Sequence, residues 1–294
     1  MLFSFLVTLR EGIEIALLVT ILLGYLRKIE QKQHFREIWI GVGAATLLSL
    51  AFGGVLEITS RELSGRVLEA FEGFTMLFAV GVLTWMVFWM KRQSAGISYN
   101  LRHRIDTALS RGSVFALGVL AFTAVAREGF ETTLFLFAGS TDTSGTQFVL
   151  GGVIGFVIAG AGGIVIYYGA AKLPLKQFFL ATGVVVIVLA AGLLSNSLSE
   201  LQEAAIITDL GSRPWDFEDS LSMTSTLGKF LHTVVGYEAA PAMAQIVLYW
   251  SYTVAILGAY LLLPSDKPPQ TRRVETSTFS APETERTHEV TSKI

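Results

Sequence analysis

The 294-residue sequence contains no cysteine and few charged residues. The lack of cysteine excludes disulfide bonds, thiolate metal clusters and a cysteine nucleophile, so any chemistry must use oxygen, nitrogen or methionine sulfur. Charged residues make up only 16% of the chain, and the formal net charge is −2. The sequence therefore offers no basic surface of the kind that binds nucleic acid.

Several catalytic motifs are absent as well. The chain has no Walker loop, no G-x-S-x-G and no H-E-x-x-H sequence, so no residues are visible for an ATP-driven or hydrolytic mechanism. The apolar N-terminal stretch lacks a basic first region and a small-residue cleavage site. We therefore expect it to be retained as the first helix rather than removed as a signal peptide.

Apolar residues are abundant instead. Hydrophobic residues make up 52% of the chain and the mean hydropathy is +0.56, which indicates an integral membrane protein. A bilayer core of about 30 Å requires roughly 20 apolar residues in a helix, and backbone groups in lipid must be satisfied within the segment. We predict an all-α polytopic membrane protein with seven transmembrane helices at residues 2–26, 38–58, 67–90, 114–138, 148–171, 178–201 and 242–263.

The positions of lysine and arginine predict the orientation of these spans. If the N-terminus lies outside, most basic loop residues fall inside, and the exceptions are Arg61, Arg66, Arg213 and Lys229. The positive-inside rule then predicts an N-out, C-in multi-pass protein. Residues 1–263 would form the transmembrane domain. Residues 264–294, rich in Pro, Thr, Ser, Glu and Arg, are predicted to be a disordered cytoplasmic tail.

An internal repeat is the next feature. The pattern R-E-G-x-E occurs at residues 10–14 and again at 127–131, and AVGVLTWM at 79–86 is weakly echoed by AAGLLSNS at 190–197. We interpret residues 1–90 and 114–201 as two copies of a three-helix unit, with the helix at 242–263 as an addition. Because three is odd, the second copy would be inverted in the membrane, as in many transporters.

Both R-E-G-x-E patterns place charged residues deep within apolar spans. Each such residue near the bilayer centre costs roughly 2.5 to 3.5 kcal/mol, so six facing lipid would exceed a typical folding free energy of about 5 to 15 kcal/mol. They must therefore face one another or water. Two arginines against four glutamates leave a negative excess that a cation or protons must balance, and carboxylates suit hard metal ions. The six residues are Arg10, Glu11, Glu14, Arg127, Glu128 and Glu131.

Glycine and further acidic residues accompany the two motifs. Gly12 and Gly129 leave room for close helix approach. Glu69 and Glu72 begin the third span and Glu203 follows the sixth, all on the predicted outer side, where they would concentrate cations at an entry. Two structural alternatives stay open: the motifs could be Arg–Glu clamps between helices, and acidic residues at helix ends could be merely solvated. The methionines and aromatic residues of LTWMVFWM are interpreted as lipid-facing or packing residues, with the tryptophan pair as anchors at the inner interface.

Taken together, these sequences resemble the high-affinity iron permease family, and most closely its bacterial ferrous iron permeases. The resemblance covers residues 1–263 and is carried by both R-E-G-x-E motifs together with FEGFTMLFAVGVLTWMVFWMKR, AREGFET, ELQEA and GYEAAP. It implies a seven-span permease of the bacterial inner or plasma membrane that imports iron, with these carboxylates as its ligands: Glu11, Glu14, Glu128 and Glu131. Arg10 and Arg127 would hold the glutamates in place.

The resemblance also implies partners. Iron, as Fe²⁺ or Fe³⁺, is expected as the transported substrate rather than a permanently bound cofactor, and an external ferroxidase or iron-binding protein is expected to supply it. Membrane lipid surrounds the chain, and the sequence leaves its oligomeric state open. Three rivals remain: a transporter of another hard cation such as Mn²⁺ or Mg²⁺, a membrane enzyme with a catalytic metal, and a sensor that binds iron without moving it.

Overall fold

A computed structural model describes residues 1–93, 105–107, 115–140, 145–169, 175–208, 210–218, 220–222 and 225–263. Within these residues the regular secondary structure is entirely helical, as predicted. The long helices are α1 (Leu2–Lys28), α2 (Phe35–Glu62), α3 (Arg66–Gln93), α5 (Ala116–Ala138), α6 (Gly145–Tyr167), α7 (Leu175–Glu203) and α9 (Met243–Leu262). Two short helices are η1 (Lys32–His34) and α8 (Thr226–Val235).

A long helix lies at each of the seven predicted positions, with ends a few residues from the predicted ones. By length and composition, α2, α3, α6, α7 and α9 are the helices of the described residues that can cross a membrane. The remaining two, α1 and α5, are also long, and they are the helices that carry the charged motifs. The tail predicted at 264–294 lies outside the described residues.

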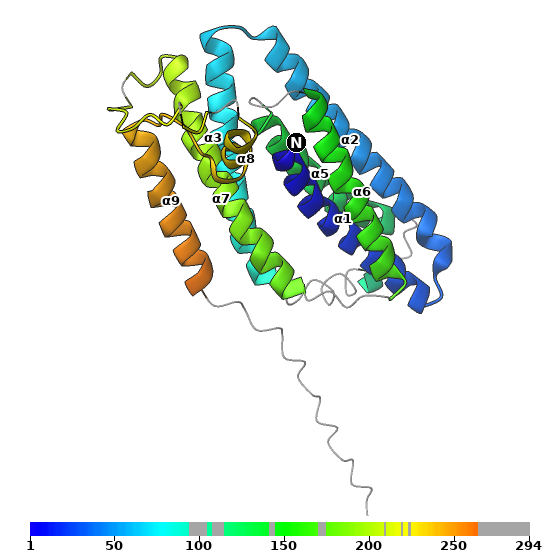
Figure 1. Ribbon diagram of the computed structural model, residues 1–294. Helices are drawn as coiled ribbons and strands as arrows, with labels where there is room; N and C mark the ends of the chain where they lie inside the picture. The colour runs from blue at the N-terminus through cyan, green and yellow to red at the C-terminus, as the bar shows by residue number, and fades with distance from the viewer. Residues whose placement is uncertain are drawn as a thin grey trace, which may run out of the picture.

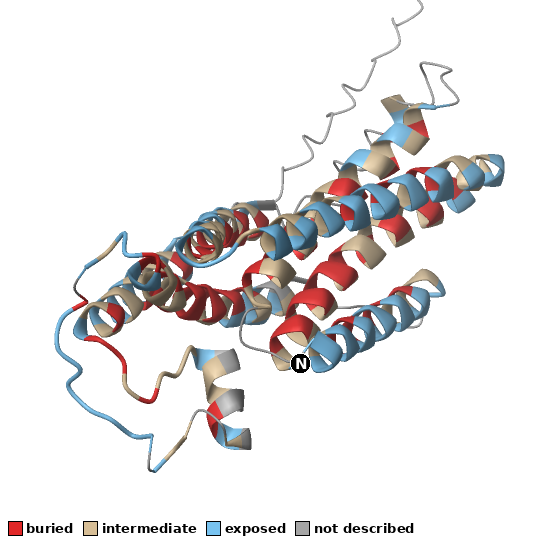
Figure 2. Cartoon of the chain, turned by 90° about the horizontal axis from the view of Figure 1, so that it is seen from above, coloured by how far each residue is buried: buried red, intermediate tan, exposed pale blue. Residues whose placement is uncertain are grey.

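The helices pack in pairs. α1 packs mainly against α6, α2 against α5, and α3 against α7, while α1 and α5 also meet each other. Figure 1 shows α1, α2, α5 and α6 as one group, with α3, α7 and α9 beside it. In the view from above, buried residues gather on the inner helices, whereas much of α2 and α6 is exposed (Figure 2). Exposed Leu and Val on these two helices are what a lipid-facing surface requires.

Two apolar clusters support this arrangement. One joins α1, α3, α5 and α7 around Met76, Met86 and Phe135, all of which are almost fully buried. The other joins α1, α2 and α5 around Leu22 and Ile38. Both clusters include α1 and α5, so these two helices lie at the centre of the bundle. Arg10 and all four motif glutamates are buried there.

The segment between α7 and α9 contains α8, which was not predicted. Ser225 caps its N-terminus by accepting a hydrogen bond of 2.9 Å from the Gly228 N–H. Gly236 ends it with φ of 68°, a left-handed conformation that glycine adopts without strain. Gly236 also lies against Gly192 of α7, where a Cβ on Gly192 would be 3.0 Å from the Gly236 Cα. The α7–α9 connection is therefore folded back onto the bundle.

Candidate metal-binding site

Three glutamates from the two R-E-G-x-E motifs meet at the centre of the bundle. Glu11 comes from α1, and Glu128 and Glu131 come from successive turns of α5. Each offers a carboxylate oxygen such that the three atoms lie within 4.8 Å of one another. The residues are only 1%, 5% and 7% exposed, respectively. This group, which we call the carboxylate triad, brings together three of the four residues predicted as metal ligands.

The triad has unused acceptor capacity. The Oε2 atoms of Glu11, Glu128 and Glu131 are buried and have no hydrogen-bond partner among the described residues. A buried carboxylate oxygen without a partner is costly, and such groups are normally satisfied by a proton, a water molecule or a metal ion. Oxygen ligands held about 2.1 Å from a small hard cation lie at most about 4.2 Å apart. Only a slight inward movement would therefore let the triad hold one ion.

Glu14, the fourth predicted ligand, has a different position. Its Oε1 lies 2.9 Å from Nη2 of Arg10, one helical turn away on α1. Arg10 also forms an ion pair with Glu11, so two carboxylates of α1 share the single positive charge of Arg10. Glu14 does not belong to the group of carboxylates within 4.8 Å of one another. It neutralises Arg10 beside the triad.

Arg10 has two further partners, which sequence reasoning missed. Its guanidinium donates to Sδ of Met86 at 3.4 Å and to Sδ of Met90 at 2.7 Å, both on α3. The sequence interpretation had these methionines as lipid-facing or packing residues, and their burial supports packing and excludes a lipid-facing position. Their i, i+4 spacing indicates one shared helix face, but nothing in the sequence indicates that this face meets Arg10.

Arg127 is held in a different way. Its Nε donates to Oε1 of Glu131 at 2.9 Å, and its guanidinium carbon lies 3.8 Å from the ring centroid of Trp89 and 5.3 Å from that of Trp85. The tryptophans were interpreted from sequence as interfacial anchors. In the structure the rings of both tryptophans also make cation–π contacts with Arg127, the arginine of the second motif. Both motif arginines therefore rest on α3.

The charges around the triad are unequal. Arg10 forms ion pairs with Glu11 and Glu14, and Arg127 forms one with Glu131. Among the described residues, no lysine or arginine lies within ion-pair distance of Glu128. The excess of negative charge expected from sequence is thus located at the triad, which favours a bound cation or protons there.

The motif glycines set the spacing of the helices. A Cβ on Gly12 would lie 2.7 Å from the Cβ of Ala159 and 3.1 Å from the ring of Phe156, both on α6. A Cβ on Gly129 would collide with the side chain of Ser49 on α2. The close approach predicted for these glycines is therefore present, and it is an approach to α6 and α2.

The three residues predicted at an entry lie away from the triad. Glu69 and Glu72 belong to the first turns of α3, and Glu203 ends α7. The two helix ends are neighbours, because a Cβ on Gly73 would lie 3.0 Å from Leu201. From Glu72 to Met86, which contacts Arg10, α3 rises by roughly 21 Å. These acidic residues therefore lie at one end of the bundle and the triad lies deep within it.

Comparison with known proteins gives a consistent result. Residues 1–265 match the Iron permease FTR1 family. The ferrous iron permease EfeU of Yersinia pestis is 36% identical over 262 residues, which are 88% of this chain and 93% of that protein. The ferrous iron permease EfeU of Escherichia coli O157:H7 is 34% identical over 262 residues, which are 88% of this chain and 95% of that protein. No solved structure matches the chain.

Proposed function

The chain belongs to the iron permease FTR1 family, and from this membership we propose that it imports iron through a site formed by the carboxylate triad. It is a multi-pass membrane protein and a transporter rather than an enzyme. The rival interpretation as a membrane enzyme with a catalytic metal is therefore removed, and the iron ion is the transported substrate of its family.

The carboxylate triad is the observation that supports this function most strongly. Three buried carboxylates from α1 and α5 lie within 4.8 Å of one another, and each has an oxygen that finds no hydrogen-bond partner in the part of the chain that the structure describes. Such oxygen donors suit a hard ion such as iron. In the proposal, Glu11, Glu128 and Glu131 bind iron directly. Glu14 becomes an iron ligand only if its ion pair with Arg10 breaks.

The proposed inverted repeat is supported by how the helices pair. If α1, α2 and α3 correspond to α5, α6 and α7, the α1–α6 pair corresponds to the α5–α2 pair. The α1–α5 and α3–α7 pairs then correspond to themselves. This is the pattern that a two-fold axis in the membrane plane would give. We propose seven spans, with α1 and α5 crossing beside the other five, in the N-out, C-in orientation.

Iron would enter from the outer side. Glu69, Glu72 and Glu203 lie at the end of the α3–α7 pair that faces outward in this orientation, where negative charge raises the local cation concentration. From there the ion would pass to the triad and leave inward by alternating exposure of the two repeats. We propose an external ferroxidase or iron-binding protein as the supplier of the ion.

Uptake of radioactive iron by cells tests this function. In the Glu128→Gln variant the side chain keeps its size and loses its charge, so uptake should fall to the level of cells without the protein while membrane expression is unchanged. The matched control is Glu57→Gln, which removes an exposed carboxylate paired with Arg61 on α2. Uptake by the control should equal that of the unaltered protein.

Three results would contradict the proposal. Normal iron uptake by Glu128→Gln would reject the triad as the transport site. Competition in the same assay separates the substrates: if Mn²⁺ or Mg²⁺ abolishes iron uptake at equal concentration and is itself transported faster, the chain moves another hard cation. Flux measured in liposomes with the purified chain distinguishes transport from mere sensing, because a sensor would bind iron without moving it.

A further inference from the structure

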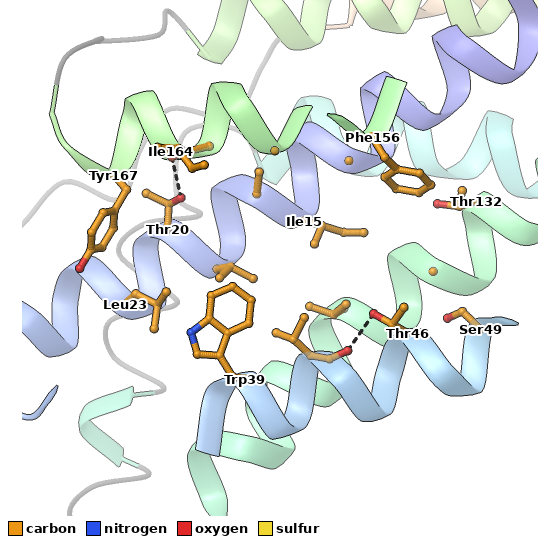
Figure 3. A pocket seen from close by; sticks show the side chains of 18 of the residues that line it. Ile15, Thr20, Leu23, Trp39, Thr46, Ser49, Thr132, Phe156, Ile164 and Tyr167 are labelled. Atoms are coloured by element: carbon orange, nitrogen blue, oxygen red, sulfur yellow. Dashed lines mark hydrogen bonds between the residues drawn. The ribbon is translucent and has the colours of Figure 1, made fainter. Parts of the chain in front are cut away.

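A groove separates the α1–α6 pair from the α2–α5 pair (Figure 3). Its volume is about 850 Å³, and it is lined by all four helices. Tyr167 and Leu23 lie at one end of the view, Trp39 nearer its middle, and Phe156 and Thr132 at the other end. The groove is partly open at its side, where exposed Leu50 and Ile164 belong to its lining.

The lining of the groove is suited to an apolar occupant. Most of it consists of aliphatic and aromatic side chains together with glycine. The serine and threonine hydroxyl groups within it donate their hydrogens to backbone carbonyls, so these donors are not available to a polar occupant. Thr46 donates to the carbonyl of Val42 at 2.9 Å, and Thr132 donates to that of Glu128 at 2.7 Å. Ser49, Thr133 and Thr20 likewise donate to backbone carbonyls.

An ion would gain little from this surface. A cation that leaves water needs oxygen ligands or continuous hydration to replace its lost shell. The groove provides mainly hydrocarbon, so it is a poor route for iron even though its deep end lies beside Gly12 and Gly129 of the two motifs.

The length of the groove corresponds to one leaflet of a membrane. Along α1 its lining extends from Leu23 to Gly12, which is roughly 16 Å of helix. Half of a bilayer core is about 15 Å. In the proposed orientation the Leu23 end faces the inner leaflet, and the Gly12 end lies near the bilayer centre.

The inner end of the groove is basic and aromatic. The Arg27 guanidinium lies 5.8 Å from the centroid of the Tyr167 ring, which lines the groove. Arg36 is exposed one helical turn before Trp39, and Lys28 and Lys32 are exposed nearby in the chain. The acidic residues at this end are Glu30, which is exposed, and Glu37, which is paired with His34 at 2.9 Å. Asp106 also lies here and accepts a hydrogen bond of 2.6 Å from the Tyr25 hydroxyl of α1. Positive charge therefore prevails at the mouth.

We propose that this groove binds an anionic phospholipid of the inner leaflet, with an acyl chain in the groove and the phosphate beside Arg27 and Arg36. Basic clusters next to membrane helices on the cytoplasmic side commonly recognise anionic headgroups. The assignment of the leaflet rests on the orientation in the proposed function. Since the lipid would fill the space between the two helix pairs, it would stabilise their packing without contacting iron.

Native mass spectrometry of the purified full-length protein tests the proposal. The protein in mild detergent is mixed with phosphatidylglycerol or phosphatidylcholine, and retained lipid is counted. We expect one phosphatidylglycerol to be retained preferentially. The Gly160→Leu variant should lose it, because Gly160 lines the groove and a Cβ there meets no atom within 4 Å. The larger side chain would then take up part of the space that the acyl chain needs.

The matched control is Gly162→Leu. Gly162 lies on the same helix and a Cβ there also meets no atom within 4 Å, but this residue does not line the groove. Lipid retention by this control should equal that of the unaltered protein. In a second pair of variants, Arg27→Gln and Arg36→Gln should each reduce the preference for phosphatidylglycerol about fivefold.

Equal retention by Gly160→Leu and Gly162→Leu would overturn the proposal, as would equal retention of the two lipids by the unaltered protein. If Gly160→Leu abolishes iron uptake while lipid retention is unchanged, the groove belongs to the ion route and the lipid assignment is wrong. The lipid readout does not involve iron. A failure of the transport proposal would be seen as normal iron uptake by Glu128→Gln. It can therefore be distinguished from a failure of the lipid proposal.

Discussion

Arg10 is almost fully buried, and its charge is balanced by carboxylates of its own helix. Its guanidinium pairs with Glu11 and Glu14 and contacts two methionine sulfurs on α3. Breaking a buried ion pair by removing one partner leaves the other charge uncompensated, which is far more costly than losing an exposed pair. Arg10 is therefore both a structural residue and the counter-charge of the proposed metal site.

We predict that Arg10→Gln lowers the free energy of unfolding by about 3 to 5 kcal/mol. The double variant Arg10→Gln with Glu14→Gln should regain part of this loss, because one of the two stranded carboxylates is then neutral. Thermal unfolding of the purified protein in detergent measures both. Arg61→Gln, which removes the cation of an exposed pair on α2, serves as the control and should change little. Equal stability of Arg10→Gln and Arg61→Gln would show that Arg10 is not needed as a counter-charge.

Many individual residues of the candidate metal site could be predicted from the sequence, but some of their contacts could not. Charged residues at matching depths in two apolar helices must be shielded together, so Glu11, Glu128 and Glu131 could be named from the sequence. Helix periodicity places Glu11 and Glu14 on nearly the same face, and it cannot decide which of them turns toward α5. The contacts of Trp89 with Arg127 and of Met90 with Arg10 depend on how α3 packs, which no local pattern contains.

At the scale of the helix, the two motifs act through glycine as much as through charge. Gly12 allows α1 to lie against α6, and Gly129 allows α5 to lie against α2. In a membrane, such small residues increase packing contacts where hydrophobic exclusion from water is absent. The triad depends on these two pairs, because they fix the rotation of α1 and α5 toward each other.

Gly12→Ala should therefore destabilise the protein although alanine favours helices. The added Cβ would lie 2.7 Å from that of Ala159, so α1 and α6 must move apart, at a cost of about 1 to 3 kcal/mol. Gly24→Ala, on the same helix with no atom within 4 Å of the added Cβ, should cause no loss. Thermal unfolding compares the two variants. A Gly12→Ala protein as stable as Gly24→Ala would contradict this packing role.

The positions of the long helices could be predicted because each is a long apolar stretch bounded by polar residues. The short helix α8 could not, since its ten residues lie in a polar connection. Its signals were the capping Ser225 and the terminal Gly236, which are common outside helices as well. Which helices form pairs was beyond the sequence, apart from the meeting of α1 and α5 that their shared charges required.

The whole molecule has a proposed orientation that its composition makes easy to test. The chain contains no cysteine, so single cysteines can be introduced without a background. Ser64 lies between α2 and α3, and Gln33 lies between α1 and α2. Both residues are exposed at opposite ends of α2.

With a membrane-impermeant maleimide applied to spheroplasts, we expect labelling of Ser64→Cys and none of Gln33→Cys until the membrane is opened. The N-out, C-in orientation places these two positions on opposite sides, outer and inner respectively. Labelling of Gln33→Cys alone in intact spheroplasts would reverse the orientation. It would also move the proposed lipid site to the outer leaflet.

The most direct measurement is X-ray absorption at the iron edge of the purified protein loaded with ferrous iron under anaerobic conditions. We expect one iron per chain with an oxygen shell that includes carboxylates, and loss of this iron from the Glu11→Gln, Glu128→Gln double variant. Retention of the same iron by the double variant, or a shell dominated by methionine sulfur, would contradict an iron site built from the glutamates of α1 and α5.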